Sequence, residues 1–263
     1  MQILQLSDLH ITAGGGKAFR QAESLTDLRH TIDYILSAGI APELAVVTGD
    51  VSSDGSLDSY RLAKEQLSRL PCPVLLVPGN HDEKPEMAEV FGSTCHTALS
   101  GEGGRCVDLH GVRLLLLDSA LPGAHSGGVS EESLQWLKEH LPDDPAVVVL
   151  VFLHHFPFSS GYTKMDKRFR SADALLSLLQ GRQNVQVCSG HLHAGMFTRR
   201  GDVNLMTCPP VSMLMALDLT PNGGGRFYTA QPGFSLHTVD AGQLSSHLGC
   251  VPFCDRHGGP YSF

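Results

Sequence analysis

Five short segments of the chain gather carboxylates, imidazoles and one amide, the side chains that hold metal ions. They are SDLH (7–10), TGD (48–50), PGNHD (78–82), LHHFP (153–157) and SGHLH (189–193). The candidate ligands in them are Asp8, His10, Asp50, Asn80, His154, His191 and His193. Imidazole nitrogens with carboxylate and amide oxygens, and no thiolate, favour divalent Mn, Fe, Co or Zn over a zinc finger or an iron–sulfur site.

The number of candidate ligands predicts two cations rather than one. Seven ligands are too many for a single ion with a coordination number of about four to six. They suit two ions that share a bridging carboxylate. Asp50 is the expected bridge, because a lone aspartate on a glycine turn has two oxygens to offer.

Each of the five segments follows an apolar run that predicts a buried strand. The runs cover 2–7, 44–48, 74–77, 146–153 and 185–188. Ligands in α/β sheets bind at the carboxyl ends of the strands, so we expect these side chains to meet there. In an extended D-x-H or H-x-H trio, the outer two side chains point to the same side. Glycines 49, 79 and 190 should let the backbone approach the cluster closely.

The remaining pattern predicts an α/β fold with two sheets. Helices over 25–36 and 57–70 separate the first three strands, so these strands should be parallel. A hairpin is expected over 106–118, helices from 131 and over 172–179, and late strands at 203–207 and 235–239. Ser130 is the expected cap of the helix that starts at Glu131. We predict one domain over residues 1–263, with about 208–263 as a candidate C-terminal cap or oligomerisation segment.

Composition limits the classes of partner. The formal net charge is -8, which argues against broad binding of nucleic acid, since that needs a basic face. The seven cysteines are scattered, and the sequence shows neither a secretory leader nor a membrane-spanning stretch. These features lead us to expect a cytoplasmic protein with reduced thiols and no membrane partner.

The five motifs, in this order, resemble those of the calcineurin-like metallophosphoesterases. That family carries D-x-H, G-D, G-N-H-[DE], H and G-H-x-H, each after a strand, and the match here spans residues 8 to 193. The GNHD and HHFP forms and the short chain are similar to the branch of class III cyclic nucleotide phosphodiesterases and bacterial glycerophosphodiesterases. The resemblance implies a four-layer α-β-β-α sandwich of two mixed sheets flanked by helices.

The resemblance also implies roles for individual residues. It assigns one ion to Asp8, His10, Asp50 and His193, and the other to Asp50, Asn80, His154 and His191, with iron or manganese expected and zinc or cobalt as alternatives. His81 would face the substrate as the catalytic residue. Aligning HHFP on the family's histidine-plus-proline element favours His154 as the ligand, so His155 is expected to lie behind the ligands.

One motif departs from a neighbouring branch. Protein phosphatases of the superfamily carry G-D-x-x-D-R-G, whereas this chain reads GDVSSDG. Asp54 lies one place late and no arginine follows, which disfavours a phosphoprotein substrate.

The resemblance to this branch implies hydrolysis of a small phosphodiester, such as 3′,5′-cyclic AMP or a glycerophosphodiester. Two ions about 3.5–4 Å apart would lower the pKa of a bridging water, and the resulting hydroxide would attack phosphorus in line. His81 would donate a proton to the leaving alkoxide or form a hydrogen bond to the anionic transition state. Asp82 follows His81, but neighbours in an extended segment point apart, so their pairing is left open.

The sequence offers weaker signals for substrate contacts. The stretch FPFSSGYTKMDKRFR (156–170) combines aromatic and basic residues directly after a candidate ligand. Phe156 and Tyr162 could stack on a base, while Lys164 and, beyond the last histidine, Arg199 could attract an anion. The alternative is an ordinary surface loop whose cations precede the helix at 172–179.

Other functions remain open at this point. The same metal core serves phosphomonoesterases and Mre11-like nucleases, although the acidic charge disfavours a nuclease. A metal-binding scaffold without activity is the least favoured, because His81 would then have no use. A homodimer or higher homo-oligomer is expected from the resemblance.

Overall fold

The structure is a computed structural model that describes residues 1–96, 102–221, 225–252 and 258–262. Its helices are α1 Ser24–Ser37, α2 Leu57–Leu67, α3 Lys84–Phe91, α4 Glu131–His140 and α5 Ala172–Leu179, with short 3-10 turns η1 Ala13–Gly15 and η2 Gly92–Thr94. Its strands are β1 Gln2–Leu6, β2 Leu44–Thr48, β3 Val74–Val77, β4 Arg105–Leu109, β5 Val112–Leu116, β6 Val148–Phe152, β7 Val185–Ser189, β8 Met196–Arg200, β9 Val203–Thr207, β10 Leu214–Met215, β11 Arg226–Thr229, β12 Gly233–Asp240, β13 Gln243–Cys250 and β14 Gly258–Ser262.

The first sheet has the strand order β13–β12–β1–β2–β3. β1, β2 and β3 run parallel, as the alternation of strands and helices predicts. β12 pairs antiparallel with β1, and β13 pairs antiparallel with β12. Residues 233–250, part of the C-terminal segment, therefore complete this sheet.

The second sheet has the order β4–β5–β6–β7–β9–β8. The predicted hairpin is confirmed, because β4 and β5 pair antiparallel. β5, β6, β7 and β9 are parallel, and β8 closes the other edge antiparallel to β9. A small separate sheet joins β10, β11 and β14.

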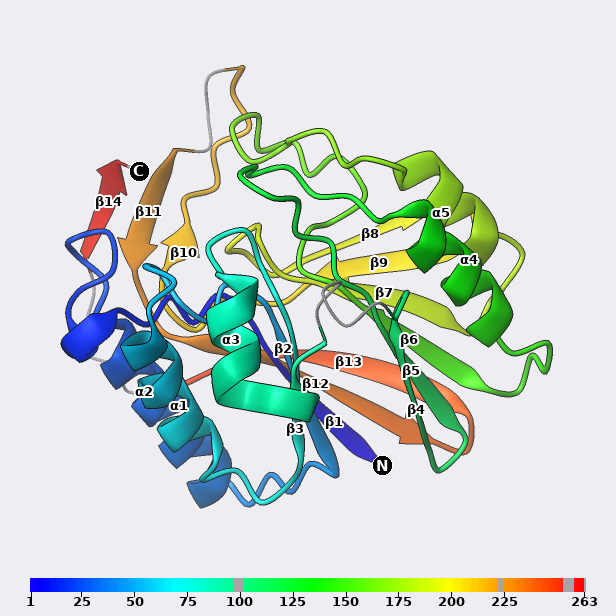
Figure 1. Cartoon of the computed structure of the whole chain (residues 1–263), viewed down its shortest axis with the longest axis horizontal. Coiled ribbons are helices and arrows are strands. Elements are labelled where there is room, and N and C mark those ends of the chain that lie inside the picture. The colour runs from blue at the N-terminus through cyan, green and yellow to red at the C-terminus, as the bar shows by residue number, and fades with distance from the viewer. Residues whose placement is uncertain (97–101, 222–224, 253–257, 263) are drawn as a thin grey trace.

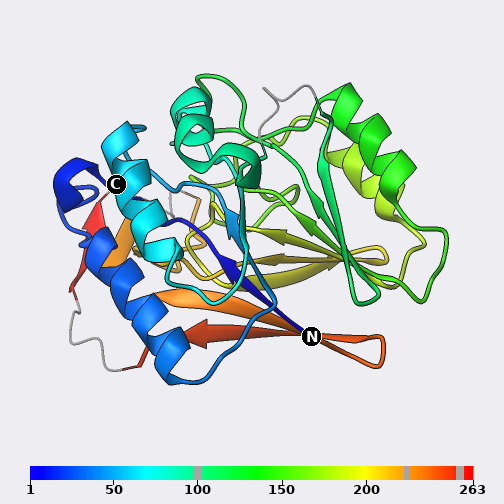
Figure 2. The same cartoon turned by 60° about the horizontal axis from the view of Figure 1, so that its bottom comes forward.

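Both faces of the central strands are buried, and this arranges the layers. Along β6, Leu150 packs between the two sheets while Val149 and Val151 face α4 and α5. Along β2, Val46 packs between the sheets while Val47 faces α1 to α3. Figure 1 and Figure 2 show α1 and α2 on one side of the strands and α4 and α5 on the other. Among the described residues, the predicted α-β-β-α sandwich is confirmed.

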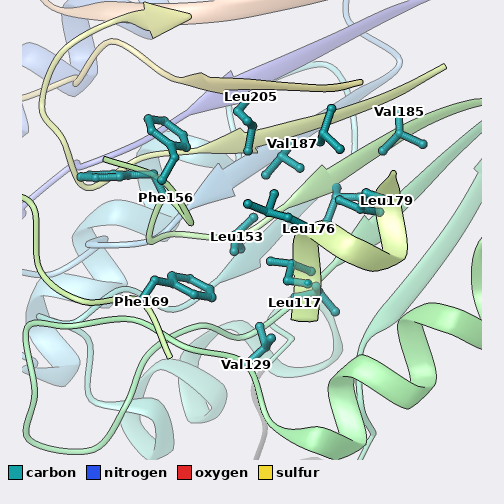
Figure 3. Packing of buried hydrophobic residues seen from close by; sticks show 14 of the residues in the cluster. Leu117, Val129, Leu153, Phe156, Phe169, Leu176, Leu179, Val185, Val187 and Leu205 are labelled. Carbon is teal, nitrogen blue, oxygen red and sulfur yellow. The ribbon is translucent and has the colours of Figure 1, made fainter. Parts of the chain in front are cut away.

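The core beneath α5 is aliphatic and aromatic. Figure 3 shows Leu176 and Leu179 of α5 against Val187 of β7 and Leu205 of β9. Phe156, just past β6, belongs to the same cluster. This packing fixes the ends of β6 and β7, from which candidate ligands emerge.

Caps fix two helix starts. The Ser130 hydroxyl accepts a hydrogen bond from the Ser133 N–H at the start of α4, as predicted. The Ser56 hydroxyl does the same for Ser59 at the start of α2.

Within the described ranges, no helix is both long and apolar enough to cross a membrane. The cytoplasmic location stays a prediction.

Candidate metal centre

The candidate ligands emerge where parallel strands of both sheets end. Asp8 and His10 follow β1, Asp50 follows β2, and His154 follows β6. Hydrogen bonds join the loops of the two sheets: the His191 N–H donates to Asp8 Oδ2 at 3.1 Å, and His154 Nδ1 lies 2.7 Å from the Thr48 carbonyl. The two sheets therefore meet at one polar centre.

The first group consists of Asp8, His10, Asp50 and His193, all buried. One potential ligand atom from each lies within 4.8 Å of the others. His193 Nε2 is 3.3 Å from Asp8 Oδ1, and His10 Nε2 is 3.5 Å from Asp50 Oδ2. The two Nε2 atoms lie 3.1 Å apart. This is a donor set that fits one divalent cation.

The second group contains His154 and His191, with His155 beside them. His154 Nε2 is 3.3 Å from Asp50 Oδ2 and 3.2 Å from His191 Nδ1. The same Asp50 oxygen thus lies close to His10 of the first group and His154 of the second. Asp50 occupies the place expected of a bridging carboxylate.

Asn80 lines a cavity together with Asp50 and His191. Its Oδ1 is buried and has no hydrogen-bond partner among the described residues, while its Nδ2 lies 3.1 Å from His125 Nδ1. A buried acceptor without a partner is costly unless a cation or another donor satisfies it. The amide therefore fits a metal-binding role next to Asp50 and His191, with which it lines one cavity.

His155 lies closer to the ligands than the sequence predicted. Its Nδ1 is 3.0 Å from Ser119 Oγ, and its Nε2 is buried with no hydrogen-bond partner in the described part of the chain. One of its ring nitrogens falls within 4.8 Å of ligand atoms of His154 and His191. The structure therefore places a third imidazole in this group.

Carbonyl groups orient the imidazoles. His154 Nδ1 lies 2.7 Å from the Thr48 carbonyl, and His193 Nδ1 lies 3.0 Å from the Met213 carbonyl. A ring that donates from Nδ1 leaves the Nε2 lone pair free for a metal. Met213 comes from the C-terminal segment, so that segment takes part in holding the site.

The backbone at the ligands is not extended, contrary to the expectation for D-x-H and H-x-H. Positive φ angles occur at Asp8 (54°), His10 (47°), Asp50 (49°), His191 (66°) and His193 (54°). Such left-handed angles are uncommon outside glycine and cluster at functional sites. The outer residues of each trio thus meet through tight left-handed turns rather than through the alternation of a strand.

Burial and mutual contact set the ionisation of the site. Burial holds the pKa of His10 and of His191 well below its usual range, so both rings are neutral. Burial acts to raise the pKa of Asp50, but the charge of His154 and a hydrogen bond to it prevail and hold that pKa well below normal. Burial acts to lower the pKa of His154, yet Asp50 raises it to about 9. A cation would displace the proton that this pair holds.

Asp82 is turned toward the loops that carry the ligands. Its Oδ2 accepts hydrogen bonds from the N–H groups of Gly79 (2.8 Å) and Val51 (3.2 Å). Its Oδ1 accepts from the Ser52 N–H at 2.9 Å and from the Tyr60 hydroxyl at 3.2 Å. Asp82 therefore fastens the turn after β3 to the turn after β2.

A cavity of about 300 Å³ opens above the ligands. Its lining residues are Phe19, Asp50, Asn80, His81, His125, Lys164, Met165, Lys167, His191 and His193. Of the candidate substrate contacts, Lys164 lines this cavity. Phe156 and Tyr162 are instead buried in the core beneath α5, where Figure 3 shows Phe156. Arg199 lies on β8, and its Nη2 is 3.5 Å from Asp202 Oδ1.

Comparison with known proteins decides the family. The family model of calcineurin-like phosphoesterases matches residues 1–195. The chain belongs to this family. The predicted family is confirmed, and with it the expectation of divalent metals at the Asp and His cluster.

Two curated relatives cover most of the chain. It is 30% identical to the probable glycerophosphodiester phosphodiesterase GpdQ of Arcobacter nitrofigilis, over 100% of this chain and 97% of the relative. It is also 30% identical to the 3′,5′-cyclic adenosine monophosphate phosphodiesterase CpdA of Pseudomonas aeruginosa, over 81% of this chain and 77% of the relative. Purple acid phosphatase PPD1 of yellow lupin shares the fold, with a TM-score of 0.64 and 11% identity over 100% of this chain and 52% of that one.

Proposed function

We propose that this protein is a binuclear, metal-dependent phosphodiesterase that hydrolyses small phosphodiesters, with cyclic nucleotides and glycerophosphodiesters as candidates. The observation that carries the proposal is the position of Asp50 Oδ2, 3.5 Å from His10 Nε2 and 3.3 Å from His154 Nε2. A carboxylate oxygen close to imidazoles of both groups suits a carboxylate that bridges two cations. The names of the curated relatives support the substrate class.

The ligands divide between two ions. Asp8, His10, Asp50 and His193 would hold one, and Asp50, Asn80, His154 and His191 the other. Such ions supply an activated water and neutralise charge on the phosphate oxygens. The nitrogen and oxygen donors suit iron or manganese, with zinc or cobalt as alternatives.

His81 is positioned to act on the leaving group. Its backbone N–H donates to Asp50 Oδ1 at 2.9 Å, which ties the residue to the bridging carboxylate. Its ring lines the cavity and lies 5.0 Å from the His10 ring between centroids. Phe19 packs edge-on against both rings. We assign His81 the transfer of a proton to the departing alkoxide.

The cavity favours a small substrate. Its volume of about 300 Å³ lies at the low end of ligand sites. Together with the net charge of -8, this supports a small diester over a nucleic acid. A phosphomonoesterase uses the same metal chemistry and is the second candidate.

A paired assay tests the proposal. Protein reconstituted with manganese or iron is given bis-p-nitrophenyl phosphate, a diester, and p-nitrophenyl phosphate, a monoester. We expect a higher kcat/KM for the diester, and loss of turnover with both substrates in Asp50→Asn. A higher kcat/KM for the monoester would transfer the assignment to phosphomonoesterase. A screen of cyclic AMP, cyclic GMP and glycerophosphodiesters then identifies the alcohol groups.

A further inference from the structure

The loop between β6 and α5 brings two lysines to the mouth of the cavity. Lys164 and Lys167, here called the lysine pair, both line it and both are exposed to solvent. Met165 lines it between them. Among the described lining residues, Asp50 is the acidic one, and it faces the metal ligands.

The carboxylate of Asp166, in the same loop, accepts hydrogen bonds from other residues of the loop. Asp166 Oδ1 accepts hydrogen bonds from the N–H (2.7 Å) and the hydroxyl (2.6 Å) of Ser160. Its Oδ2 accepts from the Ser159 hydroxyl at 2.7 Å and from the Gly161 N–H at 2.8 Å. The carboxylate thus shapes the turn that presents the lysine pair, and its oxygens point into that turn.

The C-terminal segment supports the same loop. The Thr163 hydroxyl donates to the Thr220 carbonyl at 3.2 Å. The Lys164 side chain passes close over Gly225, where an added Cβ would lie 2.7 Å from Lys164 Nζ. The loop that carries the lysine pair is therefore held by the hydrogen bonds of Asp166 and by contacts with the C-terminal segment.

The positive charge exceeds what a simple diester needs. A phosphodiester carries a single negative charge, and in the proposed function that charge meets the metal ions. Two further ammonium groups at the cavity mouth would attract a further anion, in a protein whose net charge is negative. Resting on the proposed function, we propose that the lysine pair selects phosphodiesters whose alcohol part carries a second anionic group, such as a terminal phosphate.

Exposed charge pairs give a modest selectivity. Each lysine should raise kcat/KM for a diester with the second anionic group by up to about fivefold, and the pair should raise it by about tenfold at low salt. Added salt should reduce this preference, because the lysine pair is exposed.

Two matched substrates test the proposal. They are the p-nitrophenyl ester of thymidine 5′-phosphate and the same ester with an added 3′-phosphate. Manganese-loaded protein should give a kcat/KM about tenfold higher for the second ester at low salt. Lys164→Gln combined with Lys167→Gln should bring the ratio of the two kcat/KM values to about one. The corresponding double arginine variant should keep the ratio, as should Lys138→Gln on α4, remote from the cavity.

A binding measurement separates this proposal from the proposed function. Calorimetry compares thymidine 3′,5′-bisphosphate with thymidine 5′-phosphate on the metal-loaded protein and on the double glutamine variant. Absence of turnover of bis-p-nitrophenyl phosphate by the wild-type protein would refute the phosphodiesterase function, while the ratio of the two dissociation constants would still decide the role of the lysine pair. Equal dissociation constants in the wild-type protein, or a preference that survives in the double glutamine variant, would overturn the proposal.

Discussion

The His191 N–H donates to both carboxylate oxygens of Asp8, at 3.2 and 3.1 Å, and so joins the end of β7 to the end of β1. The contact depends on the residue before it. A Cβ at Gly190 would lie 1.8 Å from Ser7 Oγ and 2.9 Å from Asp8 Oδ2. The two sheets thus meet at the metal centre through an approach that a side chain would block.

Gly190→Ala should therefore damage metal binding as well as stability. The added methyl must push β7 away from Asp8, which we expect to lower the free energy of unfolding by about 1–3 kcal/mol. The manganese content after dialysis should fall as His191 and His193 move away from Asp8. Gly16→Ala is the matched control, because its Cβ would meet Thr12 Oγ1 at an ordinary 3.4 Å. A full metal content in Gly190→Ala would contradict this account.

Asp50→Asn should remove the coupling between the two metal sites. Asp50 Oδ2 lies next to imidazoles of both groups, whereas Asp8 contacts His193 of the first group. We expect kcat/KM to fall by about 10³-fold or more. Manganese titration followed by electron paramagnetic resonance should show no spin-coupled pair. A coupled pair of ions in Asp50→Asn would show that another group forms the bridge.

Much of the fold could be predicted because the central strands are buried on both faces. The apolar runs at 44–48 and 74–77 match β2 and β3 residue for residue. β13 could not be recognised in this way, since it is a half-exposed edge strand with the polar sequence QLSSHLGC. β8 lies at the other sheet's edge and is similarly exposed. Edge strands carry no continuous apolar signal, so their pairing depends on the rest of the fold.

The sequence indicates the residues of the site most clearly where they follow strands. Asp8, Asp50 and His154 are predicted ligands because the apolar strands before them are clear in the sequence. Phe19 and His125 could not be found, because they lie in loops whose course depends on distant contacts, such as the one between Asn80 and His125. The positive φ angles at the ligands could not be predicted either, because a strand pattern in the sequence does not indicate left-handed turns.

His81→Ala should reveal its role through the leaving group. If His81 protonates the departing oxygen, kcat/KM should fall by about 10²-fold or more for alkyl diesters, which leave poorly. Bis-p-nitrophenyl phosphate needs little protonation and should lose far less. The metal content should stay close to that of the wild-type protein, because the His81 side chain is not a proposed ligand. Equal losses for both kinds of ester would refute the role of proton donor.

Asp82→Asn should loosen the turns that carry Asp50 and Asn80. An amide has one acceptor oxygen and brings two donor hydrogens, so it cannot accept from Gly79, Val51 and Ser52 as the carboxylate does. We expect the free energy of unfolding to drop by about 1–3 kcal/mol. Hydrogen exchange should accelerate at these three amides. Tyr60→Phe, which removes a single donor to Asp82, is the milder comparison.

His237 should make stability depend on pH. It is fully buried on β12, with Nε2 3.1 Å from Gln5 Oε1 and Nδ1 2.8 Å from Ser246 Oγ. Burial lowers its pKa from 6.5 to about 4. Between these two pH values the unfolded chain binds the proton and the folded protein does not, so stability rises with pH across this window and is lost as pH falls.

The His237 contribution to stability, complete above about pH 6.5, should amount to about 3 kcal/mol over that shift. Urea unfolding of chelator-treated protein from pH 7 to pH 4.5 measures it. His237→Gln lacks this protonation, so its stability should decline less steeply with acid than that of the wild-type protein. His30→Gln, an exposed position on α1, should follow the wild-type curve. Parallel curves for His237→Gln and the wild-type protein would mean that the buried imidazole takes no part in the acid sensitivity of the fold.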